Sequence, residues 1–327
     1  MGKRGVAGIV WGAALMYGCA TAGLAAESPE LFRIVENNRY GFIDASGNVV
    51  ISPRYHEAGD FSEGLCEVME NGRFGYIDRT GNFAIPPKFD AARPFSEGLA
   101  LVNIGGKYGY VDKTGNVVIE PQFEMAWEFT GGMARIMEGK LFGYIDKTGN
   151  MVVKPMYTDA GKFYEGFATI KIGDLYGHID TTGKVVNQPR FQYAWMFSEG
   201  LSAVKISGKF GYADHSGKVV IQPRFDRAWH FSEGLAVVIQ DGKYGFIDKS
   251  GKVVIEPQYD EAWGFSEGMA MIKSGDLVGF IDTKGRMAVK PQFNEAKIFR
   301  GGVALVRKGE AWCYIDKAGK TVYEPKG

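Results

Sequence analysis

An aspartate that recurs at a fixed interval is the first candidate for chemistry in this sequence. A column of carboxylates could bind calcium or catalyse proton transfer, but calcium needs several oxygen ligands from one loop or from facing loops, and no second acid recurs beside this one. Each Asp stands three residues before a Gly, a spacing typical of a side chain that accepts backbone N–H groups in a turn. We therefore predict turn caps and no metal site at Asp44, Asp78, Asp112, Asp146, Asp180, Asp214, Asp248, Asp282 and Asp316.

Histidine and serine offer no catalytic pattern. The four His (His56, His178, His215 and His230) stand at four different positions of the repeat, and none is spaced from a Cys or another His as metal ligands are. A Ser-Glu-Gly triplet recurs, but a catalytic Ser has no reason to recur and no His recurs with it. We predict turns there, and no catalytic residue, no cofactor and no enzymatic activity. The triplet begins at Ser62, Ser96, Ser198, Ser232 and Ser266.

Four tryptophans form the best candidate binding site. Trp127, Trp195, Trp229 and Trp263 share one position of the repeat, where other copies carry Gly59, Arg93, Gly161 and Lys297. A core position rarely accepts Gly, Trp and Lys alike. Two interpretations stay open: partly buried packing, or an exposed platform on which sugar rings or extended peptides stack.

The elements that must position these residues follow from a strict 34-residue period. The Gly after the first aromatic recurs from Gly41 to Gly279 without an insertion, and the next step reaches Cys313. In the copy at 235–268, three runs rich in β-branched and aromatic residues (235–239, 243–248 and 252–256) are separated by Gly-bearing turns, which predicts three strands. Residues 257–268 are expected to be a connector.

Proline and aromatic columns frame that connector. Pro recurs from Pro53 to Pro325 in every copy, which excludes a helical repeat and predicts that the third strand leaves its sheet there. Two aromatic columns are expected to pack as plugs between successive units, because one unit cannot bury enough apolar surface by itself. They are Tyr55, Phe89, Phe123, Tyr157, Phe191, Phe225, Tyr259 and Phe293, and Phe61, Phe95, Phe129, Phe163, Phe197, Phe231, Phe265 and Phe299.

Composition and the two ends of the chain bear on compartment and partners. The formal net charge is zero, so there is no basic footprint for nucleic acid. Residues 1–26 have a basic start, an apolar stretch and small residues, which predicts a signal peptide, a short tail at 27–30 and a single domain at 31–327. We expect an exported protein, periplasmic or secreted, with no later membrane-spanning segment; a lipid anchor through Cys19 is an alternative.

The repeated pattern [YF]G[YF]IDxxGxxVIxPxFxxAxxFSEGLAxV resembles the WG-repeat, or KWG-repeat, family of bacterial exported and cell-surface proteins. The similarity covers residues 31–325. The namesake Trp is Tyr or Phe in seven of nine copies, for example Tyr40 and Phe74, Val278 stands in another, and Trp312 alone keeps it. The resemblance implies β-rich repeats and a role in interactions, and nothing finer.

We therefore predict an all-β array of nine 34-residue, three-stranded units, open and superhelical or solenoid-like, with a propeller-like ring as the alternative. The chain starts and stops in phase, which favours the open form, and three strands are few for a propeller blade. A disulfide between Cys66 and Cys313 would favour the ring.

The function expected from the export signal, the repetition and the tryptophans is a non-enzymatic extracytoplasmic scaffold. It would bind a protein or glycan of the cell envelope. The alternatives are an inert structural spacer, and an envelope-acting hydrolase or sensor whose site is formed by repeat-breaking residues. For that last case the test is whether the four His and Trp127 converge, and we expect them to scatter.

Overall fold

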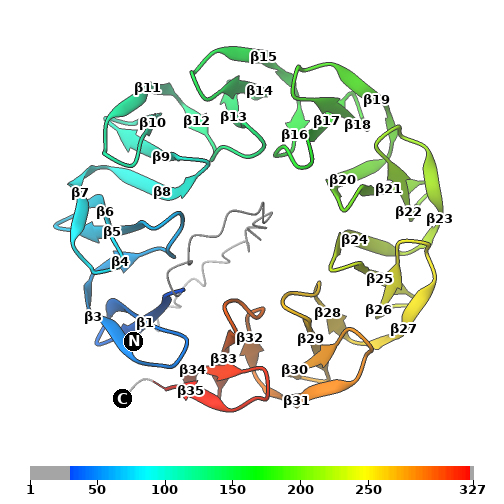
Figure 1. The fold of residues 1–327 in the computed structure, drawn as a ribbon. Coiled ribbons are helices and arrows are strands. Elements are labelled where there is room, and N and C mark those ends of the chain that lie inside the picture. The colour runs from blue at the N-terminus through cyan, green and yellow to red at the C-terminus, as the bar shows by residue number, and fades with distance from the viewer. Residues whose placement is uncertain (1–29, 325–327) are drawn as a thin grey trace, which may run out of the picture.

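The 34-residue period folds into a ring of nine antiparallel sheets arranged around one axis (Figure 1). The computed structural model describes residues 30–324; the predicted signal peptide, with Cys19, lies outside the described residues. Eight sheets have four strands and the first has three. The protein is a closed nine-bladed β-propeller, so the expected open array is wrong and the ring alternative is correct. We number the blades 1 to 9 in chain order.

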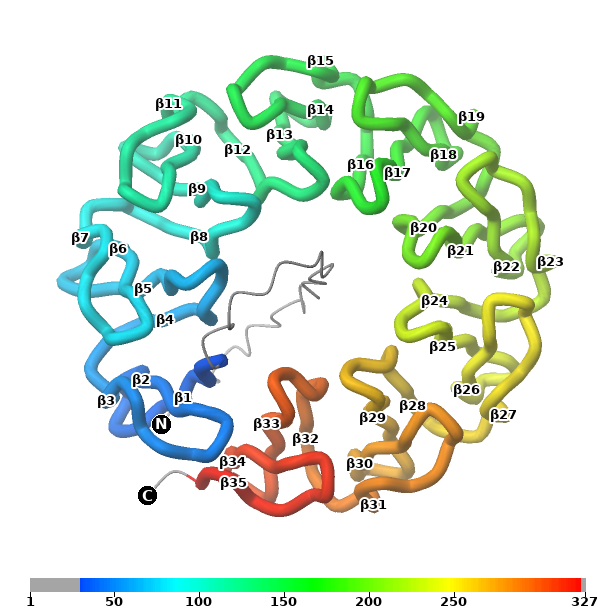
Figure 2. Tube along the Cα trace, in the orientation of Figure 1, coloured from blue at the N-terminus to red at the C-terminus, as the bar shows by residue number. Residues whose placement is uncertain are grey.

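Each blade is built from the ring axis outward, as the tube view also shows (Figure 2). The innermost strands, which blade 1 lacks among the described residues, are β4 (Glu57–Ala58), β8 (Ala91–Ser96), β12 (Met125–Ala126), β16 (Asp159–Ala160), β20 (Tyr193–Ser198), β24 (Arg227–Ser232), β28 (Glu261–Ala262) and β32 (Glu295–Ala296). The next strands are β1 (Phe32–Glu36), β5 (Cys66–Glu70), β9 (Leu99–Ile104), β13 (Met133–Glu138), β17 (Phe167–Ile172), β21 (Leu201–Ile206), β25 (Leu235–Gln240), β29 (Met269–Ser274) and β33 (Val303–Lys308).

The third strands contain the recurrent aromatic-Gly-aromatic sequence. They are β2 (Arg39–Ile43), β6 (Arg73–Ile77), β10 (Lys107–Val111), β14 (Leu141–Asp146), β18 (Leu175–Asp180), β22 (Lys209–Asp214), β26 (Lys243–Asp248), β30 (Leu277–Asp282) and β34 (Ala311–Asp316). The outermost strands are β3 (Val49–Tyr55), β7 (Phe83–Phe89), β11 (Val117–Phe123), β15 (Met151–Tyr157), β19 (Val185–Phe191), β23 (Val219–Phe225), β27 (Val253–Tyr259), β31 (Met287–Phe293) and β35 (Thr321–Tyr323).

The connector is the source of the fourth strand. In blade 4, Ala126 of the connector pairs with Ile136 of β13, so the segment leaves the outer strand of one blade and forms the inner strand of the next. Our expectation of three strands per unit is therefore wrong for eight blades. The sequence hides this strand because in five of these eight connectors it has only two residues, too few for a visible alternation.

The proline column also differs from its prediction. The outer strand does not end at Pro155 but continues to Tyr157, with a register shift opposite Gly143. Pro is tolerated because an outermost strand has an unpaired edge that needs no N–H donor. At Gly143 a Cβ would lie 2.5 Å from the carbonyl oxygen of Val153 and 2.7 Å from the nitrogen of Pro155, so only Gly fits beside this bulge.

The aspartate column caps turns, as predicted. In the turn between β10 and β11, Asp112 Oδ1 accepts the backbone N–H groups of Thr114 and Asn116, both at 2.9 Å. The hydroxyl of Thr114 also donates to this carboxylate, and these bonds hold the pKa of Asp112 below its ordinary value. The other eight aspartates accept backbone N–H groups in the same way.

Aromatic side chains join successive blades, which confirms their predicted role as plugs. All members of the Phe61–Phe299 column are at most 4% exposed. Phe129 of blade 4, for example, packs on Tyr110 of blade 3 with ring centroids 4.8 Å apart. Ser96 of the Ser-Glu-Gly turn donates a hydrogen bond of 2.7 Å to the carbonyl of the same Phe129, so the turn also links two blades. The Tyr55–Phe293 column is buried too, apart from Phe123, which is partly exposed.

The ring closes through side chains between blades 9 and 1. Phe32 packs on Tyr314 with centroids 5.6 Å apart, and the Tyr314 hydroxyl donates to the carbonyl of Arg33 at 2.7 Å. Tyr323 donates to Glu36 at 2.5 Å. Blades 1 and 9 are each formed by one continuous segment of the chain. The ring therefore closes through these side-chain contacts and not through a blade that combines strands from both ends of the chain.

The two cysteines of the described chain do not pair across this junction. Cys66 in blade 2 and Cys313 in blade 9 are buried and free, with blade 1 between their blades. The proposed disulfide test therefore could not have detected the ring. Across residues 30–324 no helix has the length and apolarity needed to cross a membrane.

Candidate binding grooves

The four tryptophans occupy equivalent places on four blades. Trp195 and Trp229 lie in inner strands β20 and β24, and Trp127 and Trp263 directly follow β12 and β28. All four are partly exposed. Trp195, Trp229 and Trp263 lie on the consecutive blades 6, 7 and 8, and Trp127 lies on blade 4, separated from them by blade 5.

Each tryptophan also packs on its own blade. Trp229 lies over Tyr244 of the third strand, with centroids 5.7 Å apart and the rings inclined by 26°. Trp127 lies over Phe142 at 5.7 Å, and the guanidinium of Arg135 stands 4.1 Å from the Trp127 ring centroid. We call the space that the indole fills, over the first aromatic of the third strand, the indole seat of the blade.

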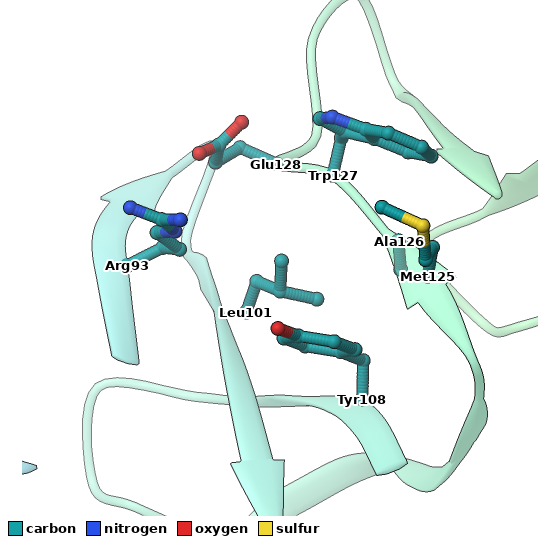
Figure 3. Close-up of a pocket in the computed structure, with 7 residues that line it drawn as sticks. All are labelled: Arg93, Leu101, Tyr108, Met125, Ala126, Trp127 and Glu128. Carbon is teal, nitrogen blue, oxygen red and sulfur yellow. The ribbon is translucent and has the colours of Figure 1, made fainter. Parts of the chain in front are cut away.

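Two grooves open beside such seats, and they are the same feature two repeats apart. The smaller, of about 150 Å³, lies between blades 3 and 4, with Trp127 and Tyr108 on opposite sides (Figure 3). The larger, of about 310 Å³, lies between blades 5 and 6 and extends to Arg135 of blade 4. Every residue of the smaller groove has its equivalent in the larger one. The seven pairs are Arg93 and Gly161, Leu101 and Thr169, Tyr108 and Tyr176, Met125 and Tyr193, Ala126 and Ala194, Trp127 and Trp195, and Glu128 and Met196.

The two grooves differ in the tryptophan column. In blade 3 the column residue is Arg93, which lines the smaller groove, whereas in blade 5 it is Gly161. A Cβ on Gly161 would meet nothing closer than the Cβ of Thr169 at 3.5 Å, so the seat of blade 5 is open. Blade 2 also has Gly in this column, but there a Cβ on Gly59 would collide with the carboxylate of Glu67, which fills the seat.

The larger groove combines aromatic faces with polar groups. Tyr176 contacts Tyr193 with centroids 5.0 Å apart, and Tyr193 meets Trp195 edge-on at 5.4 Å. The Tyr176 hydroxyl donates to Asp159 at 3.0 Å, and burial together with this carboxylate raises the pKa of Tyr176 to about 12. Burial likewise raises the pKa of Tyr193 and of Tyr164, so all three phenols are neutral donors at physiological pH.

Fixed charges stand at the edge of this groove. Arg135 donates a hydrogen bond to the carbonyl of Ala160, and burial lowers the pKa of its guanidinium. Lys162 is held by Glu128 of the preceding blade at 3.2 Å. Burial is the largest single influence on Glu128 and opposes its ionisation, but the ammonium of Lys162, hydrogen bonds and the guanidinium of Arg93 together lower the pKa of this carboxyl.

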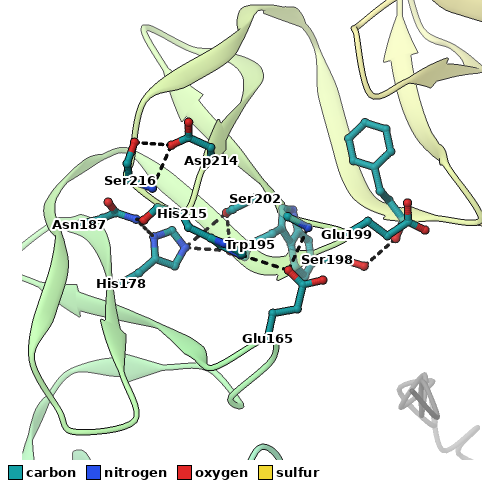
Figure 4. A network of polar contacts seen from close by, with 12 residues as sticks. Glu165, His178, Asn187, Trp195, Ser198, Glu199, Ser202, Asp214, His215 and Ser216 are labelled. Carbon is teal, nitrogen blue, oxygen red and sulfur yellow. Dashed lines mark hydrogen bonds and ion pairs between the residues drawn. The ribbon is translucent and has the colours of Figure 1, made fainter. Parts of the chain in front are cut away.

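A separate polar network breaks the repeat at the junction of blades 5 and 6 (Figure 4). His178 and His215 both pack on Phe197, with centroids 4.5 and 4.6 Å away, so our expectation that the repeat-breaking residues scatter is wrong for this pair. The Nδ1 of His178 lies 3.4 Å from the amide nitrogen of Asn187, and its Nε2 lies 3.4 Å from the hydroxyl of Ser202.

The geometry of this network is that of a core and not of a catalytic centre. Ser202 and His178 are 0% exposed, and Ser202 donates its hydroxyl proton to the carbonyl of Trp195 at 2.6 Å. Burial lowers the pKa of His178 to about 4, so this imidazole is neutral at physiological pH. A nucleophile needs contact with its substrate, which full burial prevents. Over residues 30–324 no group of three or more His, Cys, Asp or Glu side chains could hold a metal ion.

Comparison with known families decides the identity of the repeat. The family model for the WG containing repeat matches eight consecutive segments: residues 40–74, 74–108, 108–141, 142–176, 176–210, 210–244, 244–277 and 279–312. The chain belongs to the WG-containing repeat family. Five of the eight matches run from the first aromatic of one third strand to that of the next, and the other three are one residue shorter, so one WG repeat spans two neighbouring blades.

Solved structures resemble this WG-repeat ring in fold. A crystal structure of a eukaryotic initiation factor is 10% identical, covers 92% of this chain and 96% of its own, and superposes with a TM-score of 0.66. At this identity the likeness concerns the fold alone. NirN, a dihydro-heme d1 dehydrogenase, is 14% identical, with coverages of 93% and 74% and a TM-score of 0.47; PorZ of Porphyromonas gingivalis is 12% identical, with 80%, 45% and 0.35. Those two scores are too low to support an argument. No curated protein matches the chain.

Sequence reasoning located the column that builds the grooves of this WG-repeat ring but missed the open seat. It treated Gly161 as evidence that the position is variable, whereas Gly161 itself creates the larger groove. The signal was present, because Gly161 lies 15 residues before Tyr176, as Trp229 lies 15 residues before Tyr244. Only the stacked pair in the structure gives that spacing a meaning.

Proposed function

We propose that this WG-repeat propeller is an exported, non-enzymatic scaffold that binds a protein or glycan partner of the cell envelope. The observation that carries the proposal is the set of partly exposed tryptophans in or directly after the inner strands, two of which line grooves between blades. Tryptophan combines a large apolar face with one polar N–H group, which suits it to binding sites that are partly wet.

The absence of enzymatic activity belongs to the same proposal. The recurrent aspartates use their hydrogen bonds to cap turns, and the recurrent Ser-Glu-Gly turns use theirs to join blades. The asymmetric His178–Ser202 pair, which would favour a hydrolase, is buried. Neither set offers a reactive group to a substrate.

Affinity capture from a native envelope extract tests the proposal. We expect a variant with Trp127, Trp195, Trp229 and Trp263 all changed to Ala to lose a partner that the wild-type ring retains. The matched control changes Val118, Val220, Val254 and Met287 to Ala, four apolar side chains of outer strands that are 42–45% exposed. Circular dichroism verifies that both variants fold.

Two results would contradict the proposal. Equal recovery of every partner by wild type and the tryptophan variant would remove the inner-strand grooves from the function. Folded wild-type protein that retains nothing at all would support an inert structural spacer instead.

A further inference from the structure

We propose that the open indole seat of blade 5, formed by Gly161, Thr169 and Tyr176, binds one sugar ring of a glycan. This inference rests on the proposed binding function and narrows it to one site and one class of ligand.

The first step is that blade 5 has the aromatic ring of the seat but no indole in it. In blades 4 and 7 the protein fills the equivalent space with its own indole, over Phe142 and Tyr244 respectively. Blade 5 keeps the aromatic, Tyr176, but replaces the indole with Gly161, whose nearest neighbour would stand 3.5 Å from an added Cβ. In blade 2 the same loss is compensated by Glu67. In blade 5 the Tyr176 ring is contacted by Tyr193, with centroids 5.0 Å apart, and by the ammonium of Lys171, 5.5 Å from its centroid, and the larger groove lies beside Gly161.

The second step is that Tyr176 presents a stacking surface for a flat ring. The Trp229–Tyr244 pair shows the geometry that the seat imposes, with centroids 5.7 Å apart and an inclination of 26°. A pyranose ring has an apolar C–H face of similar breadth that can lie on a Tyr or Trp ring. Trp195 and Tyr193 form the adjoining wall, so a ring in the seat has aromatic contacts on more than one side.

The third step is that polar groups surround the seat, which favours a sugar over an aromatic side chain of a protein. Asp159 accepts from Tyr176 through Oδ2, leaving acceptor capacity for ligand hydroxyls, while Lys162 and the phenols of Tyr164 and Tyr193 also line the groove. An indole or phenyl ring could use at most one of these groups, whereas a sugar carries hydroxyls around its whole edge. A sugar ring can therefore make more hydrogen bonds in the groove than an aromatic side chain can.

The size of the groove sets the extent of the ligand. Its volume of about 310 Å³ is at the lower end of the range of roughly 300–1,000 Å³ for small-molecule sites. One ring therefore fits in the seat, and further residues of a glycan chain extend outside it.

Filling the seat tests the inference directly. Gly161→Trp introduces the side chain that blades 4, 6, 7 and 8 already carry, and Gly161 has no positive φ that would make the substitution strained. The probes are glucose, galactose and N-acetylglucosamine with their β-linked disaccharides, each followed by saturation-transfer NMR and titration. We expect saturable binding of at least one probe to wild type and at least a tenfold weaker affinity for Gly161→Trp. The control Gly161→Ala leaves most of the seat open and should bind nearly as wild type.

Each other outcome overturns the inference. One is that no saccharide of the panel binds at 10 mM, a concentration of about ten times a weak Kd of 1 mM. Another is that Gly161→Trp, shown to be folded by its melting curve, binds as wild type. A third is that N-acetyl-tryptophanamide binds in the seat while no sugar does, which would assign the seat to an aromatic side chain of a protein. If these occur while the fourfold tryptophan variant still loses its envelope partner, the scaffold function stands and only the sugar site fails.

Discussion

Glu67 is an acid in a buried environment. It is 9% exposed, and its Oε2 has no hydrogen-bond partner within the described residues. Its side chain occupies the seat that Gly59 leaves open in blade 2. Burial, with a smaller contribution from Asp60, raises the pKa of Glu67 to about 8, although the guanidinium groups of Arg33 and Arg93 oppose the rise. The carboxyl is therefore mostly protonated in the folded protein at neutral pH.

This environment predicts a pH-dependent loss of stability. Below about pH 4.5 Glu67 is protonated in both the folded and the unfolded chain. Between that value and about 8 only the unfolded chain loses the proton, so rising pH favours unfolding. Since one pKa unit corresponds to about 1.4 kcal/mol, we expect Glu67→Gln to be more stable than wild type by about 2 kcal/mol or more at pH 8.

Denaturant unfolding of wild type and Glu67→Gln at pH 4.5 and pH 8 measures this effect. The two proteins should differ little at the lower pH. A difference that is the same at both pH values would show that Glu67 does not titrate between them.

At the scale of the elements, the outer hairpin of each of blades 1 to 8 depends on a Gly opposite a Pro. The third strand approaches the bulged outer strand so closely that a Cβ on the recurrent Gly would overlap backbone atoms, which a side-chain adjustment cannot relieve. This contact fixes the register shift and explains why Gly and Pro recur together.

The matched pair Gly143→Ala and Gly161→Ala tests this contact. An added Cβ at Gly143 meets backbone at 2.5 Å, whereas at Gly161 its nearest contact is an ordinary one of 3.5 Å. We expect Gly143→Ala to lower the free energy of unfolding by about 2–3 kcal/mol, and Gly161→Ala to leave it within about 0.5 kcal/mol or raise it slightly. Equal effects of the two substitutions on the urea midpoint would show that the bulge does not require Gly.

At the scale of the whole molecule, the closing contact between blades 9 and 1 differs from the other eight junctions. Elsewhere the plug is a Phe that lies in or just after the inner strand, as Phe129 packs on Tyr110. At the closure it is Phe32, from strand β1 of blade 1, that packs on Tyr314, and the ion pair of Arg300 with Glu30 adds a contact between the ends.

The closure predicts that Phe32 stabilises the entire ring. We expect Phe32→Ala to lower the free energy of unfolding by about 3–5 kcal/mol, because Phe32 is 7% exposed and fills the junction. Val35→Ala in the same strand, at a residue 45% exposed, is the matched control and should have little effect. An unchanged denaturation midpoint for Phe32→Ala would contradict a closed ring.

Much of the fold was predictable because it repeats. The Asp turns and the aromatic plugs depend on spacings within one or two copies, and the structure confirms both. The proline prediction failed because Pro155 ends no strand: an edge strand needs no N–H donor on its outer side. The candidate site was predicted only in part, because the role of Gly161 depends on Tyr176 and on the indoles of other blades.

The sequence by itself determined the WG repeat, its strands, its turns and the column in which the blades differ, since these follow from residue types at fixed short spacings. Only the tertiary structure decided that the array closes, that the connector adds a fourth strand, and that blade 5 keeps an open seat. Closure depends on the angle accumulated over nine blade junctions and on contacts between residues almost 300 positions apart, such as Arg33 and Tyr314. A local sequence pattern does not determine this accumulated angle.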